Sequence, residues 1–238
     1  IDVDIREYTI NNELDFILKD IYVNNYDVIL FSTYIWNVND IVKICNNLKK
    51  VNKNVKIALG GPEVTYDSEE SMKKYDFVDY ILYGEGELVF RDFVKSLKGD
   101  IDIKDVNGIV YRNNGDIVKN KPMKDIENLD IIPSPYVDLN KAEYENRIVY
   151  YETSRGCPFN CQYCLSSTLQ GLRYFSIDRV KSDLKALIDA RVSQIKFIDR
   201  TFNANKKFAM EIMQFLMEND NDYTTYHFEV TAHLLTED

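Results

Sequence analysis

The sequence predicts an α/β fold, in which short buried strands alternate with amphipathic helices. Continuous apolar runs such as DVILFS (27–32) are typical of strands that are buried on both faces of a parallel sheet. Between such runs, apolar residues recur at helical spacing, as Val38, Ile41 and Cys45 do. Alternation of strands with helices predicts parallel, doubly wound sheets.

The first series of this alternation occupies residues 1–100. We expect its strands at IDVDIREYTI (1–10), DVILFS (27–32), VKIALGG (55–61) and VDYILYGEGE (78–87). The first of these alternates apolar and polar residues with period two, as a strand does. Helices are expected after each strand, over the apolar stripes that begin near residues 12, 38, 68 and 90. These elements predict one domain over residues 1–100.

Residues 101–147 interrupt the alternation. The stretch VNGIVYRNNGDIVKNKP predicts a small hairpin that turns at Asn113, Asn114 and Gly115. The stretch IENLDIIPSPY, with two prolines, is typical of an extended linker. We therefore expect a hairpin and linker rather than a domain in this segment.

Alternation resumes over residues 148–238. Strands are expected at 148–154, 194–199 and 225–234, with helices between them. Ser176 is the expected N-cap of the first helix. Three strand–helix steps predict a second parallel unit that continues the α/β architecture.

Charge and hydropathy argue against several classes of function. The formal net charge of −10 is spread along the chain, whereas a nucleic-acid duplex needs a clustered basic face, so we expect a small-molecule substrate instead. No apolar run approaches the roughly 18 residues of a membrane span, and no signal-peptide pattern begins the sequence. Four cysteines in 238 residues are not a disulfide framework, so we expect a reducing, cytoplasmic compartment.

Three of the four cysteines lie within TSRGCPFNCQYCLSS (153–167), in the pattern C-x3-C-x2-C. Cys157, Cys161 and Cys164 follow an expected strand directly, at the strand end where barrel enzymes place their chemistry. A cubic iron–sulfur cluster that is held by three thiolates keeps one iron open for a small molecule. The odd number of thiolates therefore favours a cluster with an open iron.

A structural zinc site is the alternative for this loop. It would need a fourth protein ligand, and the remaining candidates, Cys45, His227 and His233, are all remote in sequence. Cys45 also lies on an apolar helical stripe, where a core thiol is the expected role.

The segment RGCPFNCQYC resembles the signature of the radical S-adenosylmethionine (radical SAM) enzymes, in which an aromatic residue, here Tyr163, precedes the last cysteine. The resemblance implies that Cys157, Cys161 and Cys164 ligate a 4Fe-4S cluster whose open iron binds S-adenosylmethionine (SAM). It further implies that one electron from a low-potential donor splits SAM and produces a 5′-deoxyadenosyl radical. Residues 148–238 would then form the first half of that family's partial barrel.

Two acidic residues are candidates for catalytic roles under this resemblance. Many radical SAM enzymes bind the SAM amino group with a Gly-Gly-Glu-like stretch after the second barrel strand, and FIDRTFNAN (197–205) lacks one. Asp199 could take that acidic role, and its alternative is a local cap or pair with Arg200. Glu229 is expected to face the barrel interior beside His227 and contact cofactor or substrate, and its alternative is a solvent-facing strand end.

The first half of the chain resembles the cobalamin-binding domain that precedes many radical SAM barrels. That domain has a serine at the end of one strand and a Gly-Gly at the end of the next, and FSTYIWN, ALGGPEVT and YGEGE supply matching stretches. The resemblance implies that the serine and threonine hydrogen-bond the nucleotide tail of cobalamin and that the glycines let the tail lie close to the backbone. Glycines after strands are common in doubly wound domains, so a domain without cobalamin is the alternative. The matching residues are Ser32, Thr33, Tyr34, Gly60, Gly61, Gly84 and Gly86.

The resemblance also implies missing parts. Residues 1–10 correspond to the second strand of the cobalamin-binding domain, and its first strand has no counterpart. Its Asp-x-His-x-x-Gly motif is also absent. The barrel usually has six strands and three are expected here, so we expect the natural protein to be longer.

Two classes of function follow. The first is a radical SAM enzyme that acts by hydrogen abstraction or by cobalamin-mediated methyl transfer, with relatives that include the anaerobic magnesium-protoporphyrin monomethyl ester cyclase and various methyltransferases. The second is an iron–sulfur electron-transfer or cobalamin-binding module without radical chemistry. An electron carrier needs no open iron, so three cysteines favour the enzyme.

Overall fold

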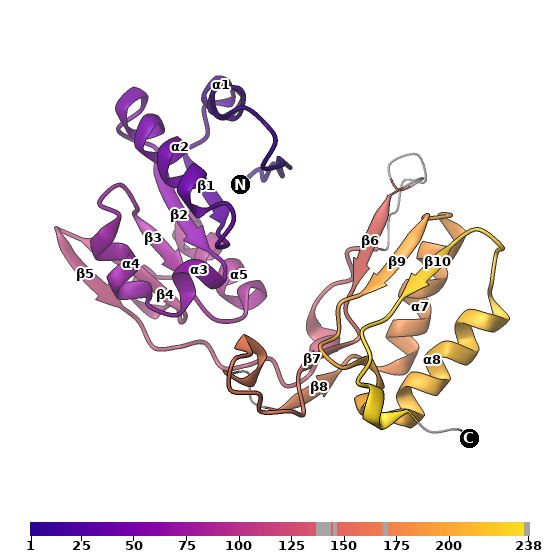
Figure 1. Cartoon of the computed structure of the whole chain (residues 1–238). Coiled ribbons are helices and arrows are strands. Elements are labelled where there is room, and N and C mark those ends of the chain that lie inside the picture. Colours follow the sequence, from indigo (N-terminus) through magenta and orange to yellow (C-terminus); the bar gives the residue numbers. More distant parts are fainter. Residues whose placement is uncertain (137–143, 145–146, 169–170, 236–238) are drawn as a thin grey trace. The chain divides into compact units, whose positions relative to one another are not determined.

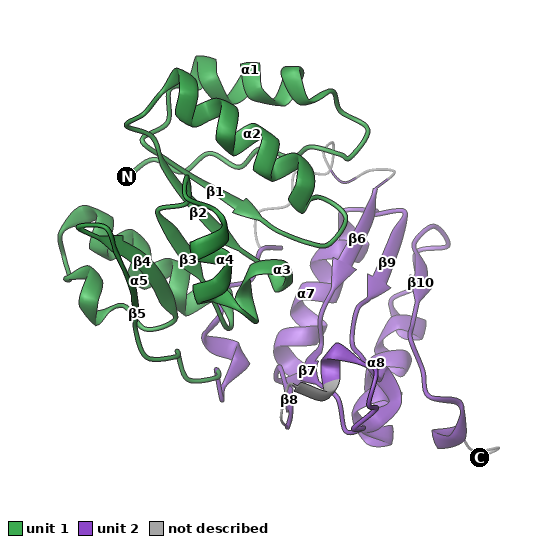
Figure 2. Cartoon of the chain, turned by 60° about the vertical axis from the view of Figure 1, so that its left-hand side comes forward, with its two compact units in different colours: residues 1–125 green, residues 126–238 purple. Residues whose placement is uncertain are grey.

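The computed structural model describes residues 1–136, 144, 147–168 and 171–235 (Figure 1). The chain divides into two compact units, residues 1–125 and 126–238, which Figure 2 shows in green and purple. Part of the linker expected within residues 101–147 lies outside the described residues.

The first unit contains a five-stranded sheet of order β1-β2-β3-β4-β5. The first three strands are parallel, and β4 and β5 extend the sheet in antiparallel fashion. In the register of β1 with β2, Ser32 lies opposite Gly60, so the two strands end side by side. The strands are β1 (Val28–Ser32), β2 (Lys56–Gly60), β3 (Tyr80–Leu82), β4 (Ile109–Asn113) and β5 (Asp116–Lys119).

Helices cover both faces of this sheet, which confirms the doubly wound arrangement. Buried side chains of α2, α3 and α4 pack on one face with Ile57, Leu59 and Ile81. Val89 and Phe93 of α5 pack on the other face. Helix α1 packs against α2 beside β1. The helices are α1 (Leu14–Asn24), α2 (Val38–Val51), α3 (Pro62–Thr65), α4 (Ser68–Lys74), α5 (Gly86–Lys98) and the short 3-10 turn η1 (Ile103–Asp105).

The hairpin predicted at Asn113–Gly115 is confirmed. Asn113 pairs with Asp116, which leaves a two-residue turn. Asn114 and Gly115 have φ angles of 52° and 96°. Positive φ at both positions is the geometry that matches the right-handed twist of a hairpin and that Asn-Gly adopts easily.

The strand predicted at residues 1–10 is wrong. These residues form no strand, and no backbone ladder joins them to another strand among the described residues. The side chains of Ile1, Val3 and Ile5 are exposed. The hydroxyl of Tyr26 donates to Asp4 at 2.5 Å, so a side-chain contact holds the segment. Period-two alternation describes side chains, whereas a strand also needs a ladder partner, and the sequence pattern does not supply one.

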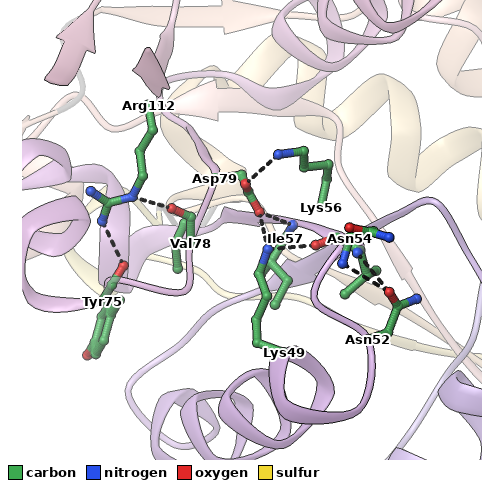
Figure 3. A network of polar contacts seen from close by, with 10 residues as sticks. Lys49, Asn52, Asn54, Lys56, Ile57, Tyr75, Val78, Asp79 and Arg112 are labelled. Carbon is green, nitrogen blue, oxygen red and sulfur yellow. Dashed lines mark hydrogen bonds and ion pairs between the residues drawn. The ribbon is translucent and has the colours of Figure 1, made fainter. Parts of the chain in front are cut away.

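Asp79 ties the start of β2 to helix α2 (Figure 3). Its carboxylate accepts from Lys49 Nζ at 2.8 Å, Lys56 Nζ at 3.0 Å and the amide of Ile57 at 2.9 Å. Burial alone would raise the pKa of Asp79, but these hydrogen bonds outweigh it and lower the pKa below its ordinary value.

The second unit contains three parallel strands of order β10-β9-β6 with α7 and α8 on one face (Figure 1). Side chains that point toward the helices are buried, as Val149, Tyr151, Ile195 and Phe197 are. The Ser176 cap is confirmed, since its Oγ accepts from the Arg179 amide at 3.3 Å. The main elements are β6 (Ile148–Tyr151), α7 (Ile177–Asp189), β9 (Gln194–Phe197), α8 (Lys206–Glu218) and β10 (Thr225–His227).

All three predicted strands of this unit are shorter than expected, and the strand at 194–199 ends at Phe197. The strand at 148–154 ends at Tyr151, and a separate strand β7 (Ser154–Gly156) pairs antiparallel with β8 (Leu172–Tyr174). The strand at 225–234 ends at His227, because the backbone beyond it bonds to the loop after β9 instead of to a strand. The remaining elements are the 3-10 turns η2 (Leu129–Ile131), η3 (Leu165–Thr168), η4 (Phe202–Ala204) and η5 (Ala232–Leu234).

None of the helices in the described ranges combines the length and the apolar composition that crossing a membrane requires.

Candidate functional site

The cysteine loop begins where β7 ends. Gly156, the last residue of β7, has a φ of 98°, and a Cβ built on it would lie 1.9 Å from the carbonyl oxygen of Gly171. Only glycine fits this close approach. Cys157 follows directly and is partly buried, whereas Cys161 and Cys164 are exposed. All four cysteines of the chain are thiols rather than disulfides.

The three loop thiols are spread along the loop. Across the described ranges, no three His, Cys, Asp or Glu side chains converge closely enough to hold a metal ion. The amide of Cys164 donates to the carbonyl of Cys161 at 3.1 Å and closes a turn whose Tyr163 side chain is 94% exposed. By donor chemistry the loop fits an iron–sulfur cluster, because three accessible thiols are the ligands that such a cluster takes.

Two contacts bring other strand-end loops to the cysteine loop. The Sγ of Cys157 lies 3.6 Å from the Thr201 hydroxyl, which follows β9. The rings of Phe159 and His233 meet edge to face with centroids 5.5 Å apart. Sequence reasoning missed Thr201 and Phe159. The available signal for Thr201 was its position just after the predicted strand at 194–199. The loops that follow parallel strands lie at the same edge of a sheet, so this loop was expected near the cysteine loop.

Asp199 lies beneath this loop and is only 1% exposed. Its carboxylate accepts from the hydroxyls of Thr153 at 2.6 Å and Ser154 at 2.5 Å and from the Thr153 amide at 3.2 Å. Burial raises the pKa of the Asp199 carboxyl above its ordinary value, and these hydrogen bonds oppose that rise. The partners of this carboxylate are thus the residues that precede the cysteines, rather than the local pair with Arg200 that sequence reasoning offered as an alternative. Contact between Asp199 and SAM stays a prediction.

Glu229 lies just after β10 and its side chain is exposed. The preceding Phe228 stacks on Phe197, on the side of the sheet that packs against the helices. His227 is exposed and pairs in register with Lys196 on the opposite side. The Glu229 carbonyl accepts the amide of Phe202 at 3.0 Å, which fixes the backbone at this position. Its role toward cofactor or substrate stays a prediction.

In the first unit, the predicted cofactor residues surround the ends of β1 and β2. Ser32 is exposed, whereas Thr33 is fully buried and its hydroxyl donates to the Gly60 carbonyl at 2.5 Å. Gly61 has a φ of 100°, and a Cβ there would lie 2.5 Å from the Thr33 carbonyl oxygen. The Thr33 hydroxyl therefore joins the two strand ends, and its predicted contact with a cofactor would have to replace this bond.

The loop after β1 is shaped by a residue that sequence reasoning missed. The side chain of Asn37 accepts from the Tyr34 amide at 2.7 Å and donates to the Ser32 carbonyl at 3.0 Å. The Tyr34 ring stacks on Trp36 with centroids 4.5 Å apart and an interplanar angle of 9°. Asparagine at a helix start often bonds local backbone in this way, and that was the available signal.

Gly84 lies in the turn between β3 and α5, and Gly86 is the first residue of α5. Gly84 has a φ of 89°, and a Cβ added to either glycine would meet no atom within 4 Å. This turn is therefore open toward its surroundings, as a turn that lies close to a ligand would need to be.

A cavity of about 730 Å³ lies beside β1 within the first unit. Ser32, Tyr34 and Trp36 contribute to its lining, together with apolar residues of α1 and α5. The predicted glycines are not part of the lining. Of the predicted cofactor residues, Ser32 and Tyr34 are thus the ones that border a hollow large enough for part of a bulky ligand.

The fold and the strand-end residues define an α/β protein with a doubly wound unit followed by a unit that carries three thiols. Residues 1–94 match the family model described as B12 binding domain. An uncharacterized methyltransferase of Pyrococcus horikoshii is 37% identical over 180 residues, which are 73% of this chain and 39% of that protein. A cobalamin-dependent radical SAM methyltransferase of Streptomyces tokunonensis is 29% identical over 187 residues, which are 74% of this chain and 28% of that protein.

Two further matches belong to the same kinds of protein. The anaerobic magnesium-protoporphyrin IX monomethyl ester cyclase of Synechocystis is 33% identical over 115 residues, which are 47% of this chain and 23% of that protein. A solved cobalamin-dependent SAM radical enzyme, with aqua-cobalamin and SAM bound, has the same fold with a TM-score of 0.72 at 21% identity, over 90% of this chain and 32% of that one. The chain is therefore a relative of the radical SAM proteins that carry a cobalamin-binding domain, and it spans less than half the length of these matches.

Proposed function

We propose that the chain acts as a radical SAM enzyme of the cobalamin-binding type, in which Cys157, Cys161 and Cys164 ligate a 4Fe-4S cluster. The observation that carries the proposal is that three thiols lie on one loop, which follows β7 and contacts the loop after the parallel strand β9, in a chain whose relatives include a radical SAM enzyme. Three protein thiolates leave the fourth iron open for SAM.

Held by Cys157, Cys161 and Cys164 and reduced by a low-potential electron donor, a cluster would supply one electron for the cleavage of a carbon–sulfur bond of SAM, with methionine and a 5′-deoxyadenosyl radical as products. The chain's own residues bind and orient the reactants. Tyr163 is exposed on the turn between two cysteines, where its ring is accessible to a bound cofactor. Glu229 is exposed just after β10, so its carboxylate is accessible to a ligand at this strand end.

Cobalamin is the second cofactor of the proposal. The family match covers residues 1–94, and Ser32 and Tyr34 border the cavity beside β1, whose lining otherwise comes mainly from residues 1–10, α1, β1 and α5. Two of the relatives are named methyltransferases, so methyl transfer to a small molecule is the reaction class that we favour. The match to a ring cyclase makes hydrogen abstraction without methyl transfer the second candidate.

Anaerobic reconstitution with iron and sulfide tests the cluster. We expect about four irons per wild-type chain, and loss of most of this iron in Cys157→Ala, Cys161→Ala and Cys164→Ala. Cys45→Ala is the matched control, because Cys45 is fully buried and burial raises the pKa of its thiol to about 12. A wild-type chain that binds one zinc and no iron, or loop variants that keep their iron, would contradict the proposal.

A further inference from the structure

One buried carboxylate connects the strand before the cysteine loop to the strand beside it. Asp199 follows β9, and its three hydrogen bonds all come from Thr153 and Ser154, which follow β6. Ser154 begins β7, the strand that leads directly into Cys157. The carboxylate thus holds the backbone amide four residues before Cys157 and the side chain three residues before it.

The residues after Asp199 contact the cysteine loop on one side and the loop after β10 on the other. On one side, the Thr201 hydroxyl lies 3.6 Å from the Cys157 Sγ. On the other side, the Asn203 side chain accepts from the Thr231 amide at 2.9 Å and donates to the Thr231 carbonyl at 3.0 Å. The loop from Asp199 to Asn203 therefore bonds to the loops after both neighbouring strands.

The burial of Asp199 favours one of two roles for its carboxylate, a contact with SAM or a structural contact within the chain. A carboxylate that contacts the SAM amino group has to be accessible to it, whereas this one is 1% exposed and already accepts three hydrogen bonds. Displacing these bonds would leave buried donors unpaired, which is costly. The arrangement suits a group that acts on the cysteine loop through its neighbours.

We propose that Asp199 is a positioning residue, which holds Thr153 and Ser154 so that β7 delivers Cys157 to the cluster-binding position. The proposal rests on the proposed function in that Cys157 is taken as a cluster ligand. Positioning requires hydrogen bonds rather than charge. The hydroxyls of Thr153 and Ser154 can turn to accept from an amide, so asparagine should replace Asp199 in this role, whereas alanine should not.

The test compares Asp199→Ala and Asp199→Asn with the control Asp183→Ala. Asp183 is also a buried carboxylate of the second unit, and it accepts from Ser134 at 2.6 Å, Tyr151 at 3.3 Å and Arg179 at 2.8 Å. Its loss should destabilise the unit without removing a bond to Thr153 or Ser154.

Hydrogen exchange of the iron-free protein gives the first readout. In Asp199→Ala we expect exchange of peptides over residues 150–161 to rise about ten-fold, because the lost bonds hold that segment closed. Peptides over residues 177–189 should change little in this variant and should change most in Asp183→Ala. Unchanged exchange at 150–161, or an equal rise over the whole unit, would overturn the proposal.

Iron loading gives the second readout. Asp199→Ala should take up less than about half of the wild-type iron under limiting reconstitution, since the first ligand is no longer held in place. Asp199→Asn and Asp183→Ala should load like wild type. If Asp199→Asn loses as much iron as Asp199→Ala does, the negative charge of Asp199 is needed for loading, and the proposed positioning role is wrong. If the wild-type chain takes no iron, the proposed function fails, and the exchange experiment still tests Asp199.

Discussion

Two carboxylates of this chain, the half-buried Asp79 and the buried Asp199, have different donors around them. Asp79 accepts from two lysines and an amide, and these bonds lower its pKa. Asp199 accepts from two hydroxyls and an amide, and burial raises its pKa. An ionised Asp79 therefore stabilises the fold, whereas an ionised Asp199 is held at a cost to folding. A group held at such a cost is expected at a functional position.

Replacing Asp79 should destabilise the first unit. We expect Asp79→Asn to lower the free energy of unfolding by about 1–3 kcal/mol at neutral pH, because partly buried cationic and amide donors lose their acceptor. The folded-state pKa of Asp79 is lowered, so its contribution is present above the unfolded pKa of about 4 and is lost as pH falls through the folded value. The difference from wild type should therefore shrink in acid, as measured by urea unfolding at several pH values.

An exposed ion pair provides the control for Asp79. Asp40 accepts from Lys43 at 3.0 Å on the surface of α2. Asp40→Asn should change the free energy of unfolding by less than about 0.5 kcal/mol, since exposed pairs contribute little. Equal effects of the two substitutions would contradict the structural role given to Asp79.

At the residue scale, the sequence predicts the side chains with recognisable spacing and misses those that act through contacts. The C-x3-C-x2-C pattern identifies Cys157, Cys161 and Cys164 without any structure. The bonds of Asp199 to Thr153 and Ser154 join residues 45 or 46 positions apart, and no periodicity signals such a pair. Long-range polar contacts depend on strand order and register, which a single sequence leaves open.

At the scale of elements, the helices were the most predictable. Each helix that the apolar stripes predict after residues 12, 38, 68, 90 and 176 is present. The strands at 1–10 and beyond His227 were mispredicted, because alternation alone does not reveal whether a backbone partner exists. The hairpin turn was predictable because its Asn-Gly chemistry is local.

The Gly-Gly turn after β2 provides a prediction at this scale. Gly61→Ala adds a Cβ 2.5 Å from the Thr33 carbonyl at a φ of 100°, so both strain and collision oppose it. We expect a loss of more than about 2 kcal/mol in the free energy of unfolding. Gly99 has a φ of 81° with no atom within 4 Å of an added Cβ, so Gly99→Ala should cost only about 1 kcal/mol.

Thermal and urea unfolding of both glycine variants measure this difference. If Gly99→Ala and Gly61→Ala destabilise equally, the close approach of Gly61 to Thr33 is not present in the folded protein. The collision, rather than the φ angle, is the distinguishing variable in this pair.

At the scale of the whole molecule, the α/β class was predictable, since strand–helix alternation marks both units. The division after residue 125 places the hairpin with the first sheet, because β4 pairs with β3. Each unit carries one of the two proposed cofactor sites, the strand ends of β1 and β2 in one and the cysteine loop in the other.

Because the two proposed sites lie in different units, each cofactor should bind without the other. We expect Cys157→Ala to lose iron and to bind cobalamin like wild type, as followed by the visible spectrum of cobalamin after gel filtration. Gly61→Ala should bind cobalamin about ten-fold more weakly, equivalent to 1.4 kcal/mol, and should load iron like wild type. Loss of both cofactors in both variants would contradict the assignment of one site to each unit.

The most direct test of the central claim is electron paramagnetic resonance of the reconstituted, reduced chain with and without SAM. We expect a cluster signal whose g values shift when SAM is added, since SAM would bind the iron that lacks a protein thiolate. A cluster signal that is unchanged by SAM would contradict an open iron and would favour an electron-transfer module.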